Sequence, residues 1–296
     1  MTAFLFWVGL ELKESWQRSG PALFSLVGLA ALGGMLLPGA LYLLVSPKEP
    51  RGFGVPMVTD VALSLGALSW LAPQSALRPL LGGLGVLDDL GGLFLLAFFY
   101  GHGLHPFWLI GLFLLLGIGF WLGHLPWTLG PLGLGCWLLL ERAGFQPALS
   151  GALVASLVPS TLLASWRTRL TPWIESLVVP LFLLAQGGFP LRGVGLGRVG
   201  LGILLGLWLG KPLGILLASG LAFRLGWGAW PSTLSLREGI AGACLGGIGL
   251  TVSLYLAASL WQGTLLDQAR LGLLLGSLLS FGTAWVIVRW NGFKVL

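Results

Sequence analysis

The sequence predicts an all-α polytopic membrane protein with about eleven transmembrane segments. Of the 296 residues, 56% are hydrophobic and 9% are charged, and the mean hydropathy is +0.93. A soluble domain carries about a quarter charged residues, so this chain cannot cover its surface with polar groups in water. The composition therefore excludes soluble enzymes, secreted disulfide scaffolds and disordered proteins.

Long apolar runs, separated by polar or Gly/Pro-rich breaks, define the expected segments. A helix needs about 20 apolar residues to cross the hydrocarbon. A β-barrel would show alternating segments of about ten residues, whereas these runs are continuous, so helices are favoured. The expected segments are 1–17, 21–46, 55–73, 77–100, 106–123, 127–141, 147–164, 172–190, 197–221, 237–261 and 267–290.

The charges outside these segments indicate partners and orientation. The net charge is +6, but no run of Lys or Arg could track a phosphate backbone, so nucleic acid is not expected. With the amino terminus outside, nine basic residues fall on one side and six on the other, which favours a cytoplasmic carboxyl terminus. Cys136 and Cys244 lie far apart in apolar segments, without metal-ligand spacing. We expect no cofactor.

Four ionisable residues lie inside apolar runs: Asp60, Asp88, Asp89 and Lys211. Charges at membrane depth are costly and are functional candidates by default. Neighbouring residues point about 100° apart on a helix. One acid of the Asp88–Asp89 pair can therefore meet Lys211 while the other faces a water-filled cavity. Such a carboxylate holds a proton or coordinates a hard cation, which is the chemistry of proton-coupled cation exchange. The alternative is a structural ion pair with a hydrated Asp89.

Two of the expected helices are interrupted. The segment 55–73 carries Pro56 ahead of Thr59 and Asp60. The segment 237–261 carries three glycines within ACLGGIGLTVS, namely Gly246, Gly247 and Gly249. A packing kink would explain either break alone.

The two interrupted segments are the middle members of three-helix groups, 21–100 and 197–290, which run in opposite senses. Interrupted helices at matching positions of inverted repeats indicate a transporter's binding site. The exposed helix ends carry partial charges that Asp60 and Lys211 could neutralise.

Six stretches together resemble the NhaA type of bacterial sodium/proton antiporter, in family order over almost the whole chain. They are FWVGLELK (6–13), TDVALSLG (59–66), LDDLGGLFLLAFFY (87–100), PWIESLVVPLF (172–182), GKPLGILL (210–217) and CLGGIGLTVSLYLAASL (244–260). The resemblance implies NhaA-like inverted repeats with two broken, crossing helices.

The resemblance also implies roles for individual residues. Asp89 is similar to the main sodium and proton ligand, and Asp88 to the neighbour that pairs with Lys211 when sodium is absent. Thr59 and Asp60 are similar to the first crossing point. Three glycines are similar to the second crossing point: Gly246, Gly247 and Gly249.

A pH-activation region is implied near the amino terminus, where Glu11 resembles one of its acidic members and Lys13 lies beside it. Several departures from the family pattern put pH regulation in doubt: Thr171 replaces a histidine, Ser15 replaces an acid, and Gln186–Gly187–Gly188 replaces Asn–Ala–Gly. The hairpin used for dimer contact is absent, which weakens the expectation of a homodimer.

The implied function is exchange of external protons for internal Na+ or Li+ by alternating access, in sodium and pH homeostasis. More protons than metal ions would move, so exchange would be electrogenic. The implied partners are Na+, Li+, H+ and the lipid bilayer, and the implied location is the bacterial inner membrane. The protein is not expected to be an enzyme.

The expected domain organisation has four parts. Residues 1–20 form a truncated first helix of an interface domain, 21–100 the first repeat of the transport domain, 101–196 the interface and linking helices, and 197–296 the second repeat. Since the first segment is shorter than a span of about 30 Å requires, the reading frame is expected to extend upstream. The alternative is a shortened natural protein whose first segment dips into the membrane and is buried by its neighbours.

Two alternative functions use the same buried charges. A sodium-coupled organic-solute symporter of related fold would need a large polar cavity, and the spans offer few Asn, Gln or Ser. An intramembrane aspartyl protease would need acids on two helices facing one scissile bond, whereas Lys211 would hold one acid ionised.

Overall fold

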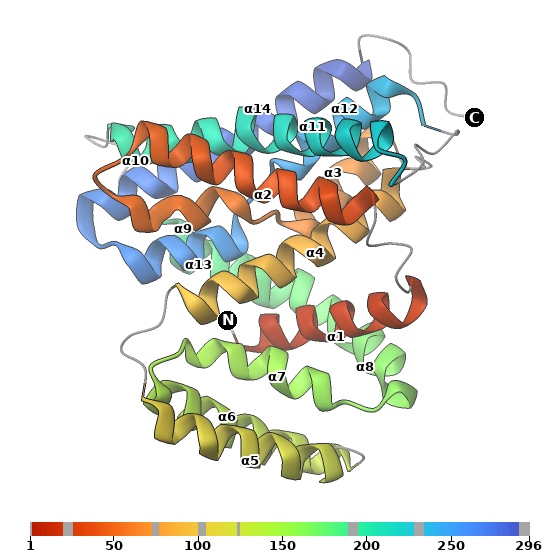
Figure 1. Cartoon of the computed structure of the whole chain (residues 1–296), viewed down its shortest axis with the longest axis vertical. Coiled ribbons are helices and arrows are strands. Elements are labelled where there is room, and N and C mark those ends of the chain that lie inside the picture. Colours follow the sequence, from red (N-terminus) through yellow and green to blue (C-terminus); the bar gives the residue numbers. More distant parts are fainter. Residues whose placement is uncertain are drawn as a thin grey trace. The chain divides into compact units, whose positions relative to one another are not determined.

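The structure is a computed structural model that describes seven stretches of the chain: residues 2–19, 26–72, 77–99, 105–122, 125–188, 195–227 and 234–289. Within these stretches every regular element is a helix (Figure 1). The chain forms two compact units. The first unit comprises residues 1–20 and 93–184, and the second comprises residues 21–92 and 185–296.

The first unit is built from helices that approach closely through small residues. Helix α1 packs against α7 and α8, and α5 packs against α6. A Cβ atom on Gly151 would lie 2.2 Å from Thr2 O, so only glycine allows this approach of α7 to α1. The elements are α1 (Thr2–Ser19), α5 (Pro106–Leu122), η3 (Pro126–Thr128), α6 (Leu129–Ala143), η4 (Pro147–Leu149), α7 (Ser150–Leu157) and α8 (Ser160–Trp173), followed by the π-helical turn η5 (Ile174–Val178) and α9 (Val179–Gly187, which runs past the unit boundary).

The second unit contains both interrupted helices. Helices α2 and α11 lie side by side in it (Figure 1). A Cβ on Gly33 would lie 2.3 Å from Gly214 O, and one on Gly214 would lie 2.1 Å from Gly33 O, so the two backbones touch. The elements are α2 (Leu26–Val45), η2 (Pro50–Met57), α3 (Val61–Leu71), α4 (Leu77–Phe98, which runs past the unit boundary), α10 (Gly197–Leu205), the π-helical turn η6 (Gly206–Gly210), α11 (Lys211–Arg224), α12 (Leu236–Gly246), α13 (Thr251–Leu260) and α14 (Gly263–Arg289).

Two clusters of buried apolar side chains hold the second unit together. One joins α3, α4, α12 and α14 and includes Leu68, Leu81 and Leu245. The other joins α2, α4, α11 and α12 and includes Leu84 and Ile215. Helices α4 and α12 contribute to both clusters, so their positions are fixed on two sides.

One of the expected breaks between helices lies at a different place in the chain. We expected a break at residues 165–171, but a continuous helix runs from Ser160 to Gly187, and the chain breaks at Val158 and Pro159 instead. The polar run stays helical because Arg167 pairs with acids on α1. A π-helical turn follows Pro172 in this helix; such turns accommodate local distortions inside α-helices.

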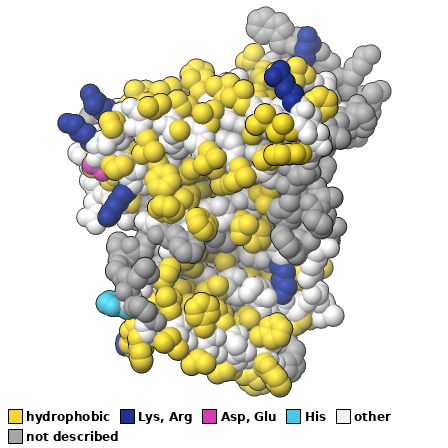
Figure 2. Space-filling model, viewed as in Figure 1, with side chains coloured by type: hydrophobic (Ala, Val, Ile, Leu, Met, Phe, Trp, Pro, Cys, Tyr) yellow, Lys and Arg dark blue, Asp and Glu magenta, His cyan; other side chains and the backbone are white. Residues whose placement is uncertain are grey.

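The surface fits a protein that lies in a bilayer. Within the described stretches, six helices are long and apolar enough to cross a membrane: Val27–Val45, Pro50–Leu71, Ser160–Gly187, Gly197–Arg224, Leu236–Leu260 and Gly263–Arg289. Hydrophobic side chains cover much of the face shown in Figure 2. Phe120 and Trp121 are each 81% exposed, an exposure suited to lipid. The protein is therefore an all-α polytopic membrane protein, and the count of eleven spans stays a prediction.

Candidate functional site

The first broken helix is interrupted between η2 and α3. The 3₁₀-helix η2 ends at Met57, and the backbone is extended at Val58 and Asp60 before α3 begins. Asp60 is the N-cap of α3, and its Oδ1 accepts a hydrogen bond from Leu63 N at 3.1 Å. Carboxylates are favoured caps because the first amides of a helix have no partner within it.

The second broken helix crosses the first at this point. Helix α12 ends at Gly246 and α13 begins at Thr251. Asp60 N donates to Ile248 O at 2.7 Å, which joins the non-helical segments of the two broken helices. A Cβ on Gly249 would lie 2.4 Å from Val58 O, so the crossing requires glycine there.

The buried Asp60 carboxylate accepts hydrogen bonds from the amino ends of α3 and α13, the second halves of the two broken helices. Besides capping α3, Asp60 accepts a hydrogen bond from Thr251 N, the first residue of α13, at 3.2 Å from its Oδ2. Helix amino termini carry partial positive charge. Asp60 is 4% exposed and therefore neutralises two such termini inside the protein.

The carboxyl ends of η2 and α12, the first halves of the two broken helices, also have hydrogen-bond partners. Lys211 Nζ donates to Met57 O, at the end of η2. Thr59 Oγ1 lies 2.7 Å from Gly246 O, at the end of α12, and also contacts the Asp88 carboxylate. The last carbonyls of a helix have no donor within it, so the Lys211 ammonium and the Thr59 hydroxyl replace the backbone donors that are missing at the breaks.

Asp88 and Lys211 form a fully buried ion pair at the crossing. Lys211 Nζ lies 2.8 Å from Asp88 Oδ2, and both side chains are 0% exposed. Asp88 Oδ1 has no hydrogen-bond partner among the residues that the structure describes. Asp89, the next residue of α4, is 8% exposed.

The arrangement can take up protons or a hard cation. When ionised, Asp60, Asp88 and Asp89 carry three negative charges against the positive charge of Lys211. Excess negative charge at low dielectric attracts a proton or a metal cation. Carboxylates, the Thr59 hydroxyl and backbone carbonyls are the oxygen ligands that hard cations use. Within the described stretches no three His, Cys, Asp or Glu side chains come together, so hydroxyl or carbonyl oxygens would have to complete a ligand set.

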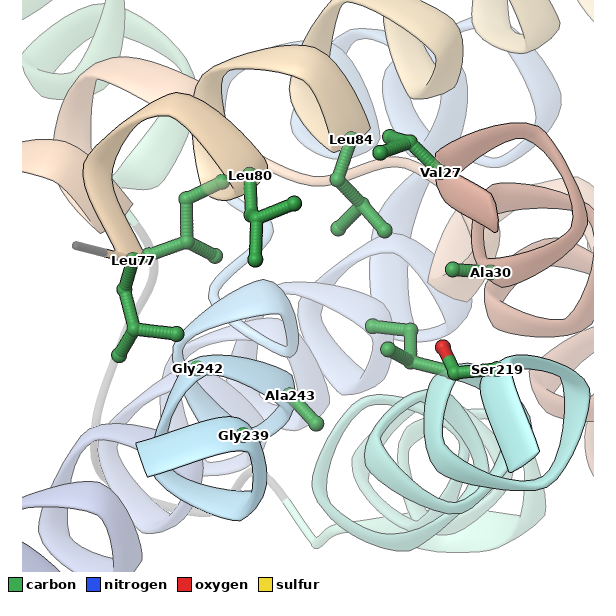
Figure 3. A pocket seen from close by; sticks show the side chains of 11 residues that line it. Val27, Ala30, Leu77, Leu80, Leu84, Ser219, Gly239, Gly242 and Ala243 are labelled. Carbon is green, nitrogen blue, oxygen red and sulfur yellow. The ribbon is translucent and has the colours of Figure 1, made fainter. Parts of the chain in front are cut away.

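A small cavity lies between helices of the second unit (Figure 3). It has a volume of about 70 Å³ and is lined by side chains of α2, α4, α11 and α12. Leu84 is one helical turn before Asp88, and Ile215 is one turn after Lys211. The lining is apolar except for the Ser219 hydroxyl, so this cavity offers an organic solute almost no polar partners.

The residues of the expected pH region, Glu11 and Lys13, lie in the first unit. Lys13 Nζ donates to Ser156 O and Val158 O, each at 2.6 Å, at the carboxyl end of α7. Arg167 Nη1 lies 2.6 Å from Glu14 Oε2, and its Nη2 lies 3.9 Å from Glu11 Oε1.

Some residues that make these contacts were not expected from the sequence. Glu14 and Arg167 were missed, although Glu11 and Glu14 share a helix face by their spacing of three. Thr171, where the resemblance implied a histidine, accepts a hydrogen bond from Trp7 Nε1 at 3.0 Å. The Ser15 side chain lies outside the described part of the structure.

Comparisons with known proteins agree on one family. A model of the family described as Na+/H+ antiporter 1 matches residues 1–288. The chain is 33% identical to a Na+/H+ antiporter NhaA 2 of Pseudomonas syringae, over 98% of this chain and 81% of that protein. It is 34% identical to a Na+/H+ antiporter NhaA of Albidiferax ferrireducens, over 95% and 78% of the two chains. It is also 34% identical to one of Nitrobacter hamburgensis, over 98% and 78%.

Proposed function

The chain belongs to the Na+/H+ antiporter 1 family, the NhaA type, and from this premise we propose that it exchanges intracellular Na+ for extracellular H+ across a bacterial cytoplasmic membrane. It is a transporter rather than an enzyme. The observation that carries the proposal is the buried Asp88–Lys211 pair beside Asp89 at the crossing of two broken helices.

Competition between protons and sodium at the two acids couples the ion fluxes. Asp89 is the main ligand. Asp88, which precedes it on α4, and the Thr59 hydroxyl, which contacts Asp88, would supply further oxygens of the site. Without sodium, Lys211 neutralises Asp88 and a proton occupies Asp89. Sodium displaces the proton, because a carboxylate oxygen that carries a proton coordinates a hard cation poorly.

Alternating access and charge movement are the finer parts of the proposal. The second unit, residues 21–92 and 185–296, carries the whole crossing and would act as the transport domain. If each cycle moves more protons than sodium ions, as the resemblance to the family implies, the exchange is electrogenic. Li+, also a hard cation that binds oxygen, is expected to be accepted. The excess of basic residues on its side supports a cytoplasmic carboxyl terminus.

Proton movement in everted vesicles tests the proposal. Respiration acidifies the vesicle lumen, and a fluorescent amine reports proton release when NaCl, LiCl or KCl is added. The wild-type protein is expected to respond to Na+ and Li+, and Asp89→Asn, which keeps the side-chain size, is expected to abolish the response. Asp267→Asn, which alters an acid paired with Arg270 near the start of α14, is the matched control.

Each arm has an outcome that contradicts the proposal. A wild-type protein that moves no protons on addition of sodium contradicts the exchange function. Exchange by Asp89→Asn at the rate of Asp267→Asn, at equal protein level, contradicts the assignment of Asp89 as the main ligand.

A further inference from the structure

The helix that carries Lys211 is distorted immediately before this residue. In η6 the Lys211 amide donates to Gly206 O, five residues back, rather than to Leu207 O, four residues back. The next residue, Pro212, has no amide hydrogen. Leu207 O therefore lacks both possible backbone donors. Lys211, the donor in an α-helix, is bonded to Gly206 O, and Pro212, the donor in a π-helix, has no amide hydrogen.

A side chain of α14 supplies the missing donor. Ser280 Oγ donates to Leu207 O at 3.2 Å, and both residues are completely buried. Without this hydroxyl the carbonyl would be left unpaired in the interior, which costs the desolvation free energy of the group. A second contact lies one turn further along: Thr283 Oγ1 accepts a hydrogen bond from Trp208 Nε1 at 3.0 Å.

The same face of α14 also reaches the second helix break. Ser277 Oγ accepts a hydrogen bond from Gly249 N at 3.2 Å. A Cβ on Gly247 would lie 2.4 Å from Ser280 Oγ and 2.5 Å from Leu207 O, so the break passes directly beside the Ser280–Leu207 hydrogen bond. Three hydroxyls spaced by three residues thus face both distortions of the site: Ser277, Ser280 and Thr283.

The π-helical turn decides where Lys211 points. One extra residue in a helical turn rotates the following side chains by about 100° around the axis. Lys211 is the first residue after the turn, and its ammonium reaches Asp88 and Met57 O from there. A regular α-helix through residues 206–210 would direct Lys211 to another side of α11.

We propose that Ser280 is a positioning residue for the cation site: its hydrogen bond to Leu207 O holds the π-helical turn that directs Lys211 toward Asp88. The transport consequence of this inference rests on the proposed exchange function, whereas its structural part does not. Removal of the hydroxyl leaves Leu207 O unpaired and the turn free to change, so the ligand Asp88 loses its fixed partner.

A double-mutant cycle on thermal stability tests the structural part. Melting temperatures of the purified protein in detergent are measured for Ser280→Ala, Lys211→Ala and the double variant. The matched control is Thr128→Val in the first unit, where a 6%-exposed hydroxyl donates to Leu122 O and Leu125 O. Residues that act through one another show non-additive effects, and distant ones do not.

Ser280→Ala is therefore expected to lower the melting temperature less in the Lys211→Ala background than in the wild type. Thr128→Val is expected to lower it equally in both backgrounds. Full additivity of Ser280→Ala with Lys211→Ala overturns the inference, and it does so whether or not the protein exchanges sodium.

Transport kinetics provide the second measurement and decide alone if Lys211→Ala does not fold. In everted vesicles Ser280→Ala is expected to raise the half-saturating Na+ concentration roughly three- to tenfold, the range that one hydrogen bond supplies. Ser280→Cys, which keeps a weak donor, is expected to lie between Ser280→Ala and the wild type, and Thr128→Val to match the wild type. If Ser280→Ala responds to sodium as the wild type does, the inference is overturned and the exchange function stands. If the wild type itself does not respond, only the exchange function is contradicted.

Discussion

Lys211 Nζ lies 2.8 Å from Asp88 Oδ2 with neither side chain exposed, and the same ammonium donates to Met57 O. Burying two charges costs several kcal/mol for each ion, and their attraction offsets this only when other hydrogen bonds satisfy the remaining donors and acceptors. Here the ammonium donates such a hydrogen bond to the Met57 carbonyl, and the Thr59 hydroxyl contacts the Asp88 carboxylate. The pair therefore joins α4 and α11 to the end of η2 and depends on the helix break for its partners.

Replacing Lys211 by alanine is expected to destabilise the protein by about 3–5 kcal/mol, because Asp88 would be left charged and buried without its cation. Lys48→Ala, at an exposed lysine, is the control and is expected to change stability by less than about 0.5 kcal/mol. Thermal melting of both variants in detergent is the measurement. Equal melting temperatures for the two variants would show that the pair does not stabilise the fold.

Asp60→Ala is expected to be more costly than the loss of an ordinary helix cap. Its carboxylate accepts from both Leu63 N and Thr251 N, so two caps are lost together, at about 0.5–2 kcal/mol each. The comparison is Ser235→Ala, which removes the N-cap hydroxyl of α12 at an exposed position. Denaturation in detergent ranks the two, and an Asp60→Ala protein as stable as Ser235→Ala would contradict the double cap.

Gly249→Ala is expected to destabilise the crossing by about 1–3 kcal/mol, as overpacking does in well-packed interiors. The new methyl group would lie 2.4 Å from Val58 O, a backbone atom that moves only with the extended segment of the other helix. Gly220→Ala, on α11 with nothing within 4 Å, is the control and is expected to be neutral or stabilising. The reverse order of melting temperatures would show that the segments do not touch at Gly249.

The sequence predicted the breaks in the helices better than it predicted their boundaries. Pro56 and the glycines near Gly249 interrupt their own segments, so the local signal was sufficient. The expected break at residues 165–171 is wrong because the polar side chains there lie in a helix. Arg167 stays in a helix because its charge is paired with Glu14, more than a hundred residues away, and no local pattern contains that contact.

By itself the sequence determined the membrane class and the candidate charges. Few charged residues in long apolar runs leave no soluble alternative, and Asp60, Asp88, Asp89 and Lys211 stand out because charge is costly at membrane depth. The resemblance to a family then supplied expected roles for these residues.

Only the tertiary structure decided which atoms meet. That Asp60 caps two helices, and that Ser280 pairs with a carbonyl left free before Pro212, depends on how segments distant in the chain cross and pack. Helix periodicity fixes the face on which a side chain lies, but the partner opposite that face is set by the packing of the other helices. Hydrogen bonds between the two non-helical segments also leave no periodic pattern in either one, so the sequence could locate both breaks without showing that they join.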